Sequence, residues 1–99
     1  MKELDHYRAL EKMISNSLKQ MESYIGCKNV SDVSTFIRVG EYGLAWELLG
    51  FLIIKNNQKF PNELIEAGNL MGLNIENIKQ RVRDIEAINK RGRNELPLV

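Results

Sequence analysis

The chain has 99 residues, of which 43% are hydrophobic and 27% are charged. This length predicts one domain, and this balance is typical of a folded globular protein, so a disordered chain is excluded. Fourteen basic and thirteen acidic residues give a formal net charge of +1, which favours neither nucleic acid nor a membrane as a partner.

The cysteine content and the amino terminus bear on the compartment. Cys27 is the only cysteine, so no internal disulfide can form and nothing indicates an oxidising environment. The amino terminus has no apolar signal region, and the longest apolar run, residues 48 to 54, is far shorter than the roughly 18 residues that span a bilayer. We therefore expect a cytoplasmic protein with no membrane partner.

Apolar residues in the first quarter of the chain recur every three or four positions. This spacing predicts an amphipathic helix over residues 3 to 24, with Gly26 ending it; its apolar positions are Tyr7, Leu10, Ile14, Leu18, Met21 and Ile25. A short second helix is expected to begin at a Ser31 cap and to end at Gly40, where a left-handed residue would close it.

The next segment, residues 41 to 56, predicts a central helix that is apolar on two of its three faces. Its richer stripe contains Trp46, which we expect to be buried beside the first and last helices, and its second stripe is formed by Leu44, Leu48 and Phe51. On the remaining face Gly43 and Gly50 flank Glu47. A glycine inside a helix costs up to about 1 kcal/mol relative to alanine, so this face should admit close backbone approach, either by another helix of the chain or by a partner.

Two further helices complete the predicted fold. One has Pro61 in its first turn and ends at Gly72, and the last begins at an Asn74 cap and ends at Gly92. The apolar positions of the last helix are Ile75, Ile78, Val82, Ile85 and Ile88. No segment shows the two-residue alternation of a strand.

The periodicity therefore predicts an all-α, compact single-domain bundle of about five helices. The bundle is expected to comprise residues 1–92, and residues 93–99 are expected to form a short C-terminal tail.

Reactive side chains are few. A nucleophile and base pair of Cys27 and His6, the only histidine, would have to meet within about 3 Å, but a continuous first helix would hold them roughly 30 Å apart. Glu63 and Glu66 share a helix face, although acids at a helix start are also favoured by its dipole. No metal-ligand set or phosphate-binding loop is visible. We expect no catalytic residue, no metal, no cofactor and no small-molecule substrate, so the protein is not expected to be an enzyme.

The last helix is the basic end of the chain. Residues 79 to 93 contain six basic and two acidic residues, whereas residues 1 to 78 contain eight basic and ten acidic residues. An alternative function is therefore a small helical regulator that contacts nucleic acid through this helix. Three pairs at helical spacing partly neutralise it, so direct nucleic-acid binding is not the main expectation: Glu76 with Lys79, Arg81 with Asp84, and Glu86 with Lys90.

Two segments carry a family resemblance. The pattern GEYGLAxEL at residues 40 to 48, followed by LIxxGxLMGL at residues 64 to 73, resembles the small helical immunity proteins of bacterial polymorphic toxin systems. The nearest resemblance is to MafI-like proteins and to CdiI-type relatives in contact-dependent growth inhibition, and it covers about residues 33 to 76. It implies a bacterial cytoplasmic protein without catalytic activity that binds the C-terminal toxin domain of a cognate effector, expected to be a nuclease.

The same resemblance directs attention to exposed acids. Inhibitors of nucleases often place carboxylates in the positive cleft that receives phosphates, because complementary charge speeds association and fixes orientation. The candidate toxin-binding residues are Asp32, Glu41, Glu47, Glu63 and Glu66. The slightly basic chain argues against simple mimicry of nucleic acid. The toxin's activity, the docking face and the oligomeric state stay open.

Overall fold

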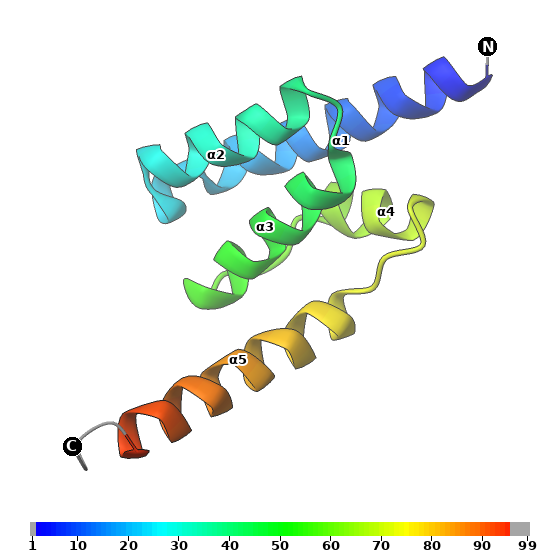
Figure 1. The fold of residues 1–99 in the computed structure, drawn as a ribbon. Helices are drawn as coiled ribbons and strands as arrows, with labels where there is room; N and C mark the ends of the chain where they lie inside the picture. The colour runs from blue at the N-terminus through cyan, green and yellow to red at the C-terminus, as the bar shows by residue number, and fades with distance from the viewer. Residues whose placement is uncertain (1, 96–99) are drawn as a thin grey trace.

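A computed structural model describes the backbone of residues 2–95 and the side chains of residues 5–84 and of Ala87. The described backbone contains five helices and no strand, so the predicted all-α fold is confirmed (Figure 1). The helices, in chain order, are α1 (Lys2–Ile25), α2 (Cys27–Arg38), α3 (Tyr42–Lys55), α4 (Asn62–Leu70) and α5 (Ile75–Glu95).

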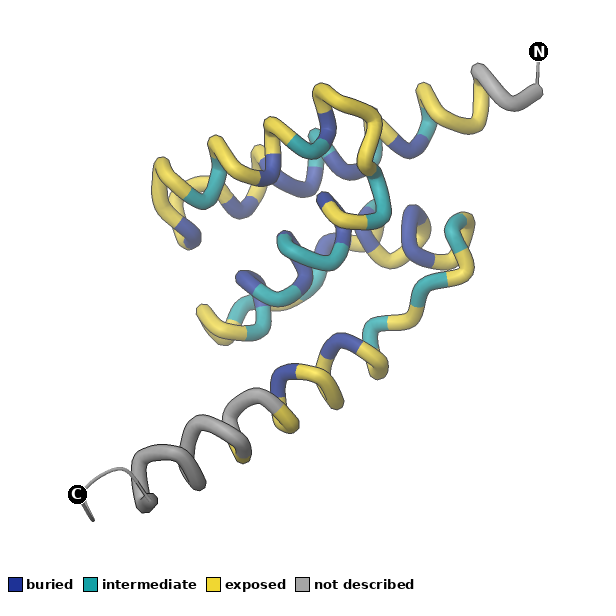
Figure 2. The backbone as a smooth tube through the Cα atoms, viewed as in Figure 1, coloured by how far each residue is buried: buried dark blue, intermediate teal, exposed yellow. Residues whose placement is uncertain are grey.

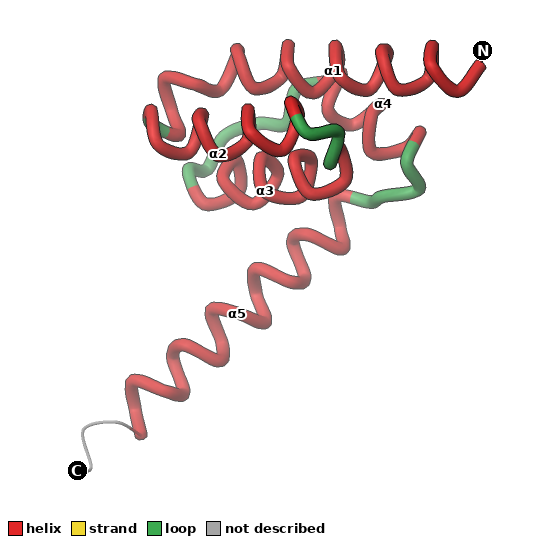
Figure 3. The backbone as a smooth tube through the Cα atoms, turned by 45° about the horizontal axis from the view of Figure 1, so that its top comes forward, coloured by secondary structure: helices red, strands yellow, loops and turns green. Residues whose placement is uncertain are grey.

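The helices are arranged around α1 and α3. Both α2 and α4 pack on α1, and α3 contacts each of the other four helices. The last helix, α5, packs on α3 with its first turns and then extends away from the others (Figures 1 and 3). Four helices therefore share the body of the fold, while α5 depends mainly on α3.

Three consecutive helices end in the same way. After α2, α3 and α4 the chain adopts a positive φ, at Gly40 (81°), Asn57 (54°) and Gly72 (72°). In each case the next amide donates to a carbonyl five residues earlier, which is the Schellman motif: Glu41 to Phe36 (2.8 Å), Gln58 to Ile53 (3.0 Å) and Leu73 to Gly68 (2.7 Å). The predicted ends at Gly40 and Gly72 are confirmed.

The second helix begins earlier than predicted. Gly26 has a φ of 88° and ends α1 as expected, but α2 starts at the next residue, and the amide of Val30 donates to the carbonyl oxygen of Gly26 (3.0 Å). The predicted Ser31 cap is therefore wrong, because Ser31 already lies inside the helix, where its carbonyl accepts the Thr35 hydroxyl (2.9 Å). Gly26 therefore both ends α1 and directly precedes α2.

The starts of α4 and α5 are close to their predicted positions. Pro61 precedes α4 by one residue, so it caps the helix and does not lie in its first turn. The Asn74 cap is confirmed, since its Oδ1 accepts the Glu76 amide (2.7 Å). The predicted end of α5 at Gly92 is wrong, because the helix continues to Glu95. A glycine costs only about 1 kcal/mol inside a helix, which is too little to end one alone.

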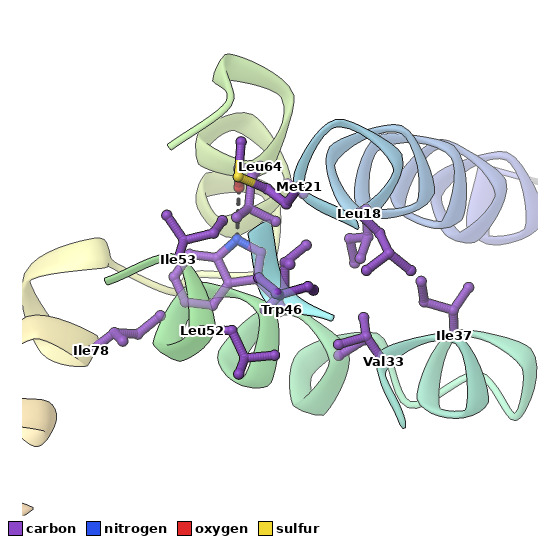
Figure 4. Close-up of a cluster of buried hydrophobic side chains, with 14 of the residues drawn as sticks. Leu18, Met21, Val33, Ile37, Trp46, Leu52, Ile53, Leu64 and Ile78 are labelled. Atoms are coloured by element: carbon purple, nitrogen blue, oxygen red, sulfur yellow. Dashed lines mark hydrogen bonds between the residues drawn. The ribbon is translucent and has the colours of Figure 1, made fainter. Parts of the chain in front are cut away.

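One apolar core joins the five helices (Figure 2). The α1 stripe is buried as predicted except for Tyr7, which is 51% exposed. Trp46 is 1% exposed, and its indole Nε1 donates to the carbonyl of Leu64 at 2.7 Å (Figure 4). The predicted burial of Trp46 is confirmed, although the hydrogen bond that fixes its ring comes from α4. Ile78 and Val82 of α5 are buried, and the side chains of Ile85 and Ile88 lie outside the described residues.

Candidate partner-binding surface

The five predicted acids lie on different elements of the fold. Asp32 on α2, Glu41 between α2 and α3, and Glu66 on α4 are exposed, whereas Glu47 on α3 and Glu63 on α4 are half-buried. Both α2 and α4 pack on α1 and α3 without extensive contact between them. The five carboxylates therefore come from α2, the turn between α2 and α3, α3 and α4, and their roles in binding stay predictions.

Glu47 is engaged within the chain. Its Oε2 lies 3.2 Å from Nη1 of Arg81, which connects α3 to α5. The two side chains are 35% and 67% exposed, so water screens the pair and it contributes at most about 1 kcal/mol. A change at Glu47 would disturb α5 as well as any partner contact.

Glu63 is engaged in a similar way. It lies in the first turn of α4, where its charge suits the helix dipole, and its Oε2 accepts a hydrogen bond from Nδ2 of Asn16 on α1 (3.0 Å). Glu66, one turn later, is exposed. Only one acid of this predicted pair is thus presented to solvent.

The two glycines on the third face of α3 have different surroundings. A Cβ at Gly50 would lie 2.6 Å from Cδ1 of Ile78, so α5 crosses α3 closely at this point. This confirms the predicted crossing by another helix of the chain. A Cβ at Gly43 would meet no atom within 4 Å. The packing of the described chain therefore does not require a glycine at position 43.

A third glycine, Gly68, was not recognised from the sequence. A Cβ at this position of α4 would lie 2.5 Å from Cζ2 of Trp46. Glycine therefore leaves the room that the indole ring of Trp46, on α3, occupies. Gly68 follows the buried Leu64 by four residues and therefore lies on the same face of the helix. That spacing was the signal available in the sequence.

Several large apolar side chains, among them Leu44 of the second predicted stripe, are exposed close in sequence to acids. At the corner between α2 and α3, Val39 (63% exposed) and Leu44 (48%) lie close in sequence to Glu41, and we call these three residues the corner patch. Leu48 and Phe51, also on the second stripe, are half-buried. The second stripe of α3 is therefore only partly covered, and Leu44, near the start of the helix, is its most exposed member.

A second such surface lies on α4. Ile65 (36% exposed) and Leu70 (50%) are exposed on the same helix as Glu66, and we call these three residues the α4 patch. Protein interfaces combine apolar residues, which lose water on binding, with a polar surround. The corner patch and the α4 patch both have this composition.

An aromatic pair lies beside the corner patch. The rings of Tyr7 on α1 and Tyr42 in the first turn of α3 have centroids 6.1 Å apart with an interplanar angle of 30°. Tyr42 is half-buried, and Tyr7 presents half of its surface to solvent. Half-exposed tyrosines often contribute strongly to binding, since one ring provides both apolar area and a hydroxyl.

The reactive side chains are far apart. His6 lies near the start of the unbroken helix α1 and Cys27 lies just beyond its end, so the predicted separation is confirmed. Within the described residues, no group of three His, Cys, Asp or Glu side chains is placed to hold a metal ion. In the same part of the chain, no helix combines the length and apolar character that crossing a bilayer requires.

Comparison with known proteins finds no family model, no curated protein and no solved structure that matches the chain. The family resemblance therefore depends on the two quoted segments alone.

Proposed function

We propose that this chain is a bacterial immunity protein that acts in the cytoplasm and neutralises a cognate toxin domain by forming a stoichiometric complex. The observation that carries the proposal concerns the two segments that resemble such proteins, residues 40 to 48 and residues 64 to 73. Although they are separate in sequence, they form one packing unit, in which the Trp46 indole donates to the Leu64 carbonyl (2.7 Å) and lies against Gly68. The two segments that carry the resemblance thus pack against each other, which supports reading them together.

The surface of this unit supports docking. The corner patch belongs to the α2 and α3 side of the unit, and the α4 patch belongs to α4. Each patch has two exposed apolar side chains near one exposed carboxylate. The apolar groups would supply affinity by losing water, and the carboxylate would orient the protein toward a basic cleft.

Inhibition in this proposal needs no chemistry by the immunity protein. A toxin that cleaves nucleic acid must present cations around its substrate cleft, and a bound protein would exclude the substrate by occupying that cleft or the surface beside it. Of the five candidate acids, Glu41 meets this requirement best, because it is exposed and lies between Val39 and Leu44.

Coexpression tests the proposal. The chain and the toxin domain encoded beside it would be produced together, and we expect growth to be rescued and a one-to-one complex to be measured by light scattering. The Leu44→Asp variant should rescue poorly, because a charge would be buried at the interface, while Tyr24→Asp, at an exposed position on α1 outside both patches, serves as the control and should rescue fully. Rescue without a measurable complex, or turnover of a substrate by the purified chain, would contradict the proposal.

A further inference from the structure

The surface where α5 crosses the end of α3 is hollow and basic. A concavity of about 510 Å³ is lined there by Ile54, Lys55, Asn57, Lys79, Val82 and Arg83. We call it the α3–α5 groove. Lys55 comes from α3 and the other two cations come from successive turns of α5, so folding gathers three positive charges from two helices. Among the described residues that line it, none is acidic.

The nearby acids are engaged with other side chains. Glu47 pairs with Arg81 (3.2 Å), and Asp84 accepts from Gln80 (3.0 Å). Glu76 pairs with Lys79 at 3.7 Å, and this contact offsets only part of the charge, because the two side chains are 69% and 45% exposed. Gln80 is neutral, so Asp84 keeps its charge, but Glu47, Glu76 and Asp84 do not line the groove, whose described lining has three cations and no acid.

Two cations of the groove, Lys55 and Arg83, contact neighbouring groups of their own helices. The Lys55 ammonium lies 5.8 Å from the centre of the Phe51 ring. The Arg83 Nε donates to the Lys79 carbonyl at 3.3 Å, which ties the guanidinium to the helix while its terminal nitrogens can serve a ligand. Side chains that are ordered in this way lose less entropy when they bind an anion.

The basic surface continues past α5. A second concavity of about 400 Å³, between α4 and the start of α5, shares Lys79 with the groove and extends to Lys59. One acid, Glu76, also lines it, together with apolar side chains and three amides: Asn62, Asn69 and Asn74. Four cations (Lys55, Lys59, Lys79 and Arg83) and one acid (Glu76) thus line the two adjoining concavities on α3, the following loop and α5. An extended row of this kind suits a polymeric anion better than a single small one.

We propose that the α3–α5 groove binds the phosphate backbone of a nucleic acid duplex. An acidic protein fits less well, because interfaces between proteins need exposed apolar anchors. Of the exposed large hydrophobic side chains in the described chain, none lines this groove, and only Ile65, 36% exposed, lines the adjoining concavity. A single strand also fits less well. Its bases stack on exposed aromatic rings, whereas Tyr7 and Tyr24, the exposed aromatics, lie on α1. This inference goes beyond the proposed immunity function and does not depend on it.

Binding would be measured by fluorescence anisotropy with the full chain, without any toxin, on DNA and RNA duplexes of about 20 base pairs in about 50 mM salt. We expect the K55Q/K79Q/R83Q variant to bind both at least tenfold more weakly. Because each phosphate contact contributes a slope of about −0.9 in a plot of log affinity against log salt, the slope should become less steep by about 2 to 3. All three residues are exposed, and circular dichroism would verify that the variant is folded.

A matched variant, K12Q/K19Q/K28Q, removes the same charge from exposed positions on α1 and α2 and should bind like the original chain. The charge-conserving variant K55R/K79R/R83K should also retain binding.

Stronger binding to one duplex would identify DNA or RNA as the source of the backbone, and equal binding would show that the shared phosphate chemistry suffices. The proposal is overturned by absence of binding to both duplexes, by equal weakening in the matched variant, or by polyglutamate competing as well as a duplex. None of these results bears on toxin binding, which is measured separately.

Discussion

Trp46 occupies a site that α4 makes for it. Its ring is buried, its Nε1 donates to the Leu64 carbonyl at 2.7 Å, and Gly68 leaves room for its six-membered ring. Trp46→Ala should lower the free energy of unfolding by about 3 to 5 kcal/mol, because it leaves a large cavity. Trp46→Phe should lower it by about 1 to 3 kcal/mol, since the buried carbonyl loses its donor. Urea denaturation measures both, and a loss below about 1 kcal/mol for the alanine variant would contradict the burial.

Glycines 68 and 43 make a matched comparison, because both lie inside helices and differ in their surroundings. Gly68→Ala should destabilise the protein by about 1 to 3 kcal/mol, since the added carbon would lie 2.5 Å from the indole, which is buried and cannot move freely. Gly43→Ala should be neutral or stabilising by up to about 1 kcal/mol, since its surroundings are open. Thermal unfolding of the two variants checks this order. Equal effects would show that the close approach at Gly68 does not govern stability.

Among the side chains that the structure describes, an apolar contact and an ion pair attach α5 to α3. Ile78 and Val82 are buried against the fold, Ile78 lies over Gly50, and one exposed ion pair joins Arg81 to Glu47. An exposed pair contributes at most about 1 kcal/mol, whereas truncating a buried isoleucine costs about 2 to 5 kcal/mol. The apolar contact therefore governs whether α5 stays on α3.

Amide hydrogen exchange tests this balance. We expect the α5 amides to exchange by local opening, at a lower free energy than those of α1 and α3, because α5 contacts mainly one helix. Ile78→Ala should increase that exchange strongly and Arg81→Gln only slightly. If α5 amides exchanged solely through global unfolding, α5 would be an integral part of the core.

At the level of the whole molecule, the distribution of acids changes the design of a docking test. Asp32 and Glu41 are exposed, whereas reversing the charge of Glu47 would place it against Arg81 and loosen α5. Under the proposed function, Asp32→Lys with Glu41→Lys should raise the dissociation constant for the toxin domain at least tenfold, about 1.4 kcal/mol, mainly through slower association.

Surface plasmon resonance would measure these rates, with Asp5→Lys and Glu22→Lys on α1 as a control of equal charge. Unchanged affinity in the folded double variant would exclude the α2 side as the docking face. The α4 patch, where Glu66 is exposed, would then be the remaining candidate docking face.

The sequence by itself determined the helices and most of their ends. The capping glycines at positions 26, 40 and 72 and the Asn74 cap act through backbone angles and hydrogen bonds between residues at most five positions apart, so a local reading can find them. The apolar period of α1 likewise selected its buried face. Gly92 misled the prediction, because a glycine ends a helix only where the chain also turns and its carbonyls find new partners.

Only the tertiary structure decided which acids are available and where the positive groove lies. The bonds from Trp46 to Leu64, from Arg81 to Glu47 and from Asn16 to Glu63 connect residues 18, 34 and 47 positions apart. No period along the chain specifies such contacts, because they depend on how helices cross once their apolar faces are buried together. For the same reason Leu44 and Leu70, apolar and regularly spaced, are exposed, while Lys55 joins two cations of a helix that begins twenty residues later.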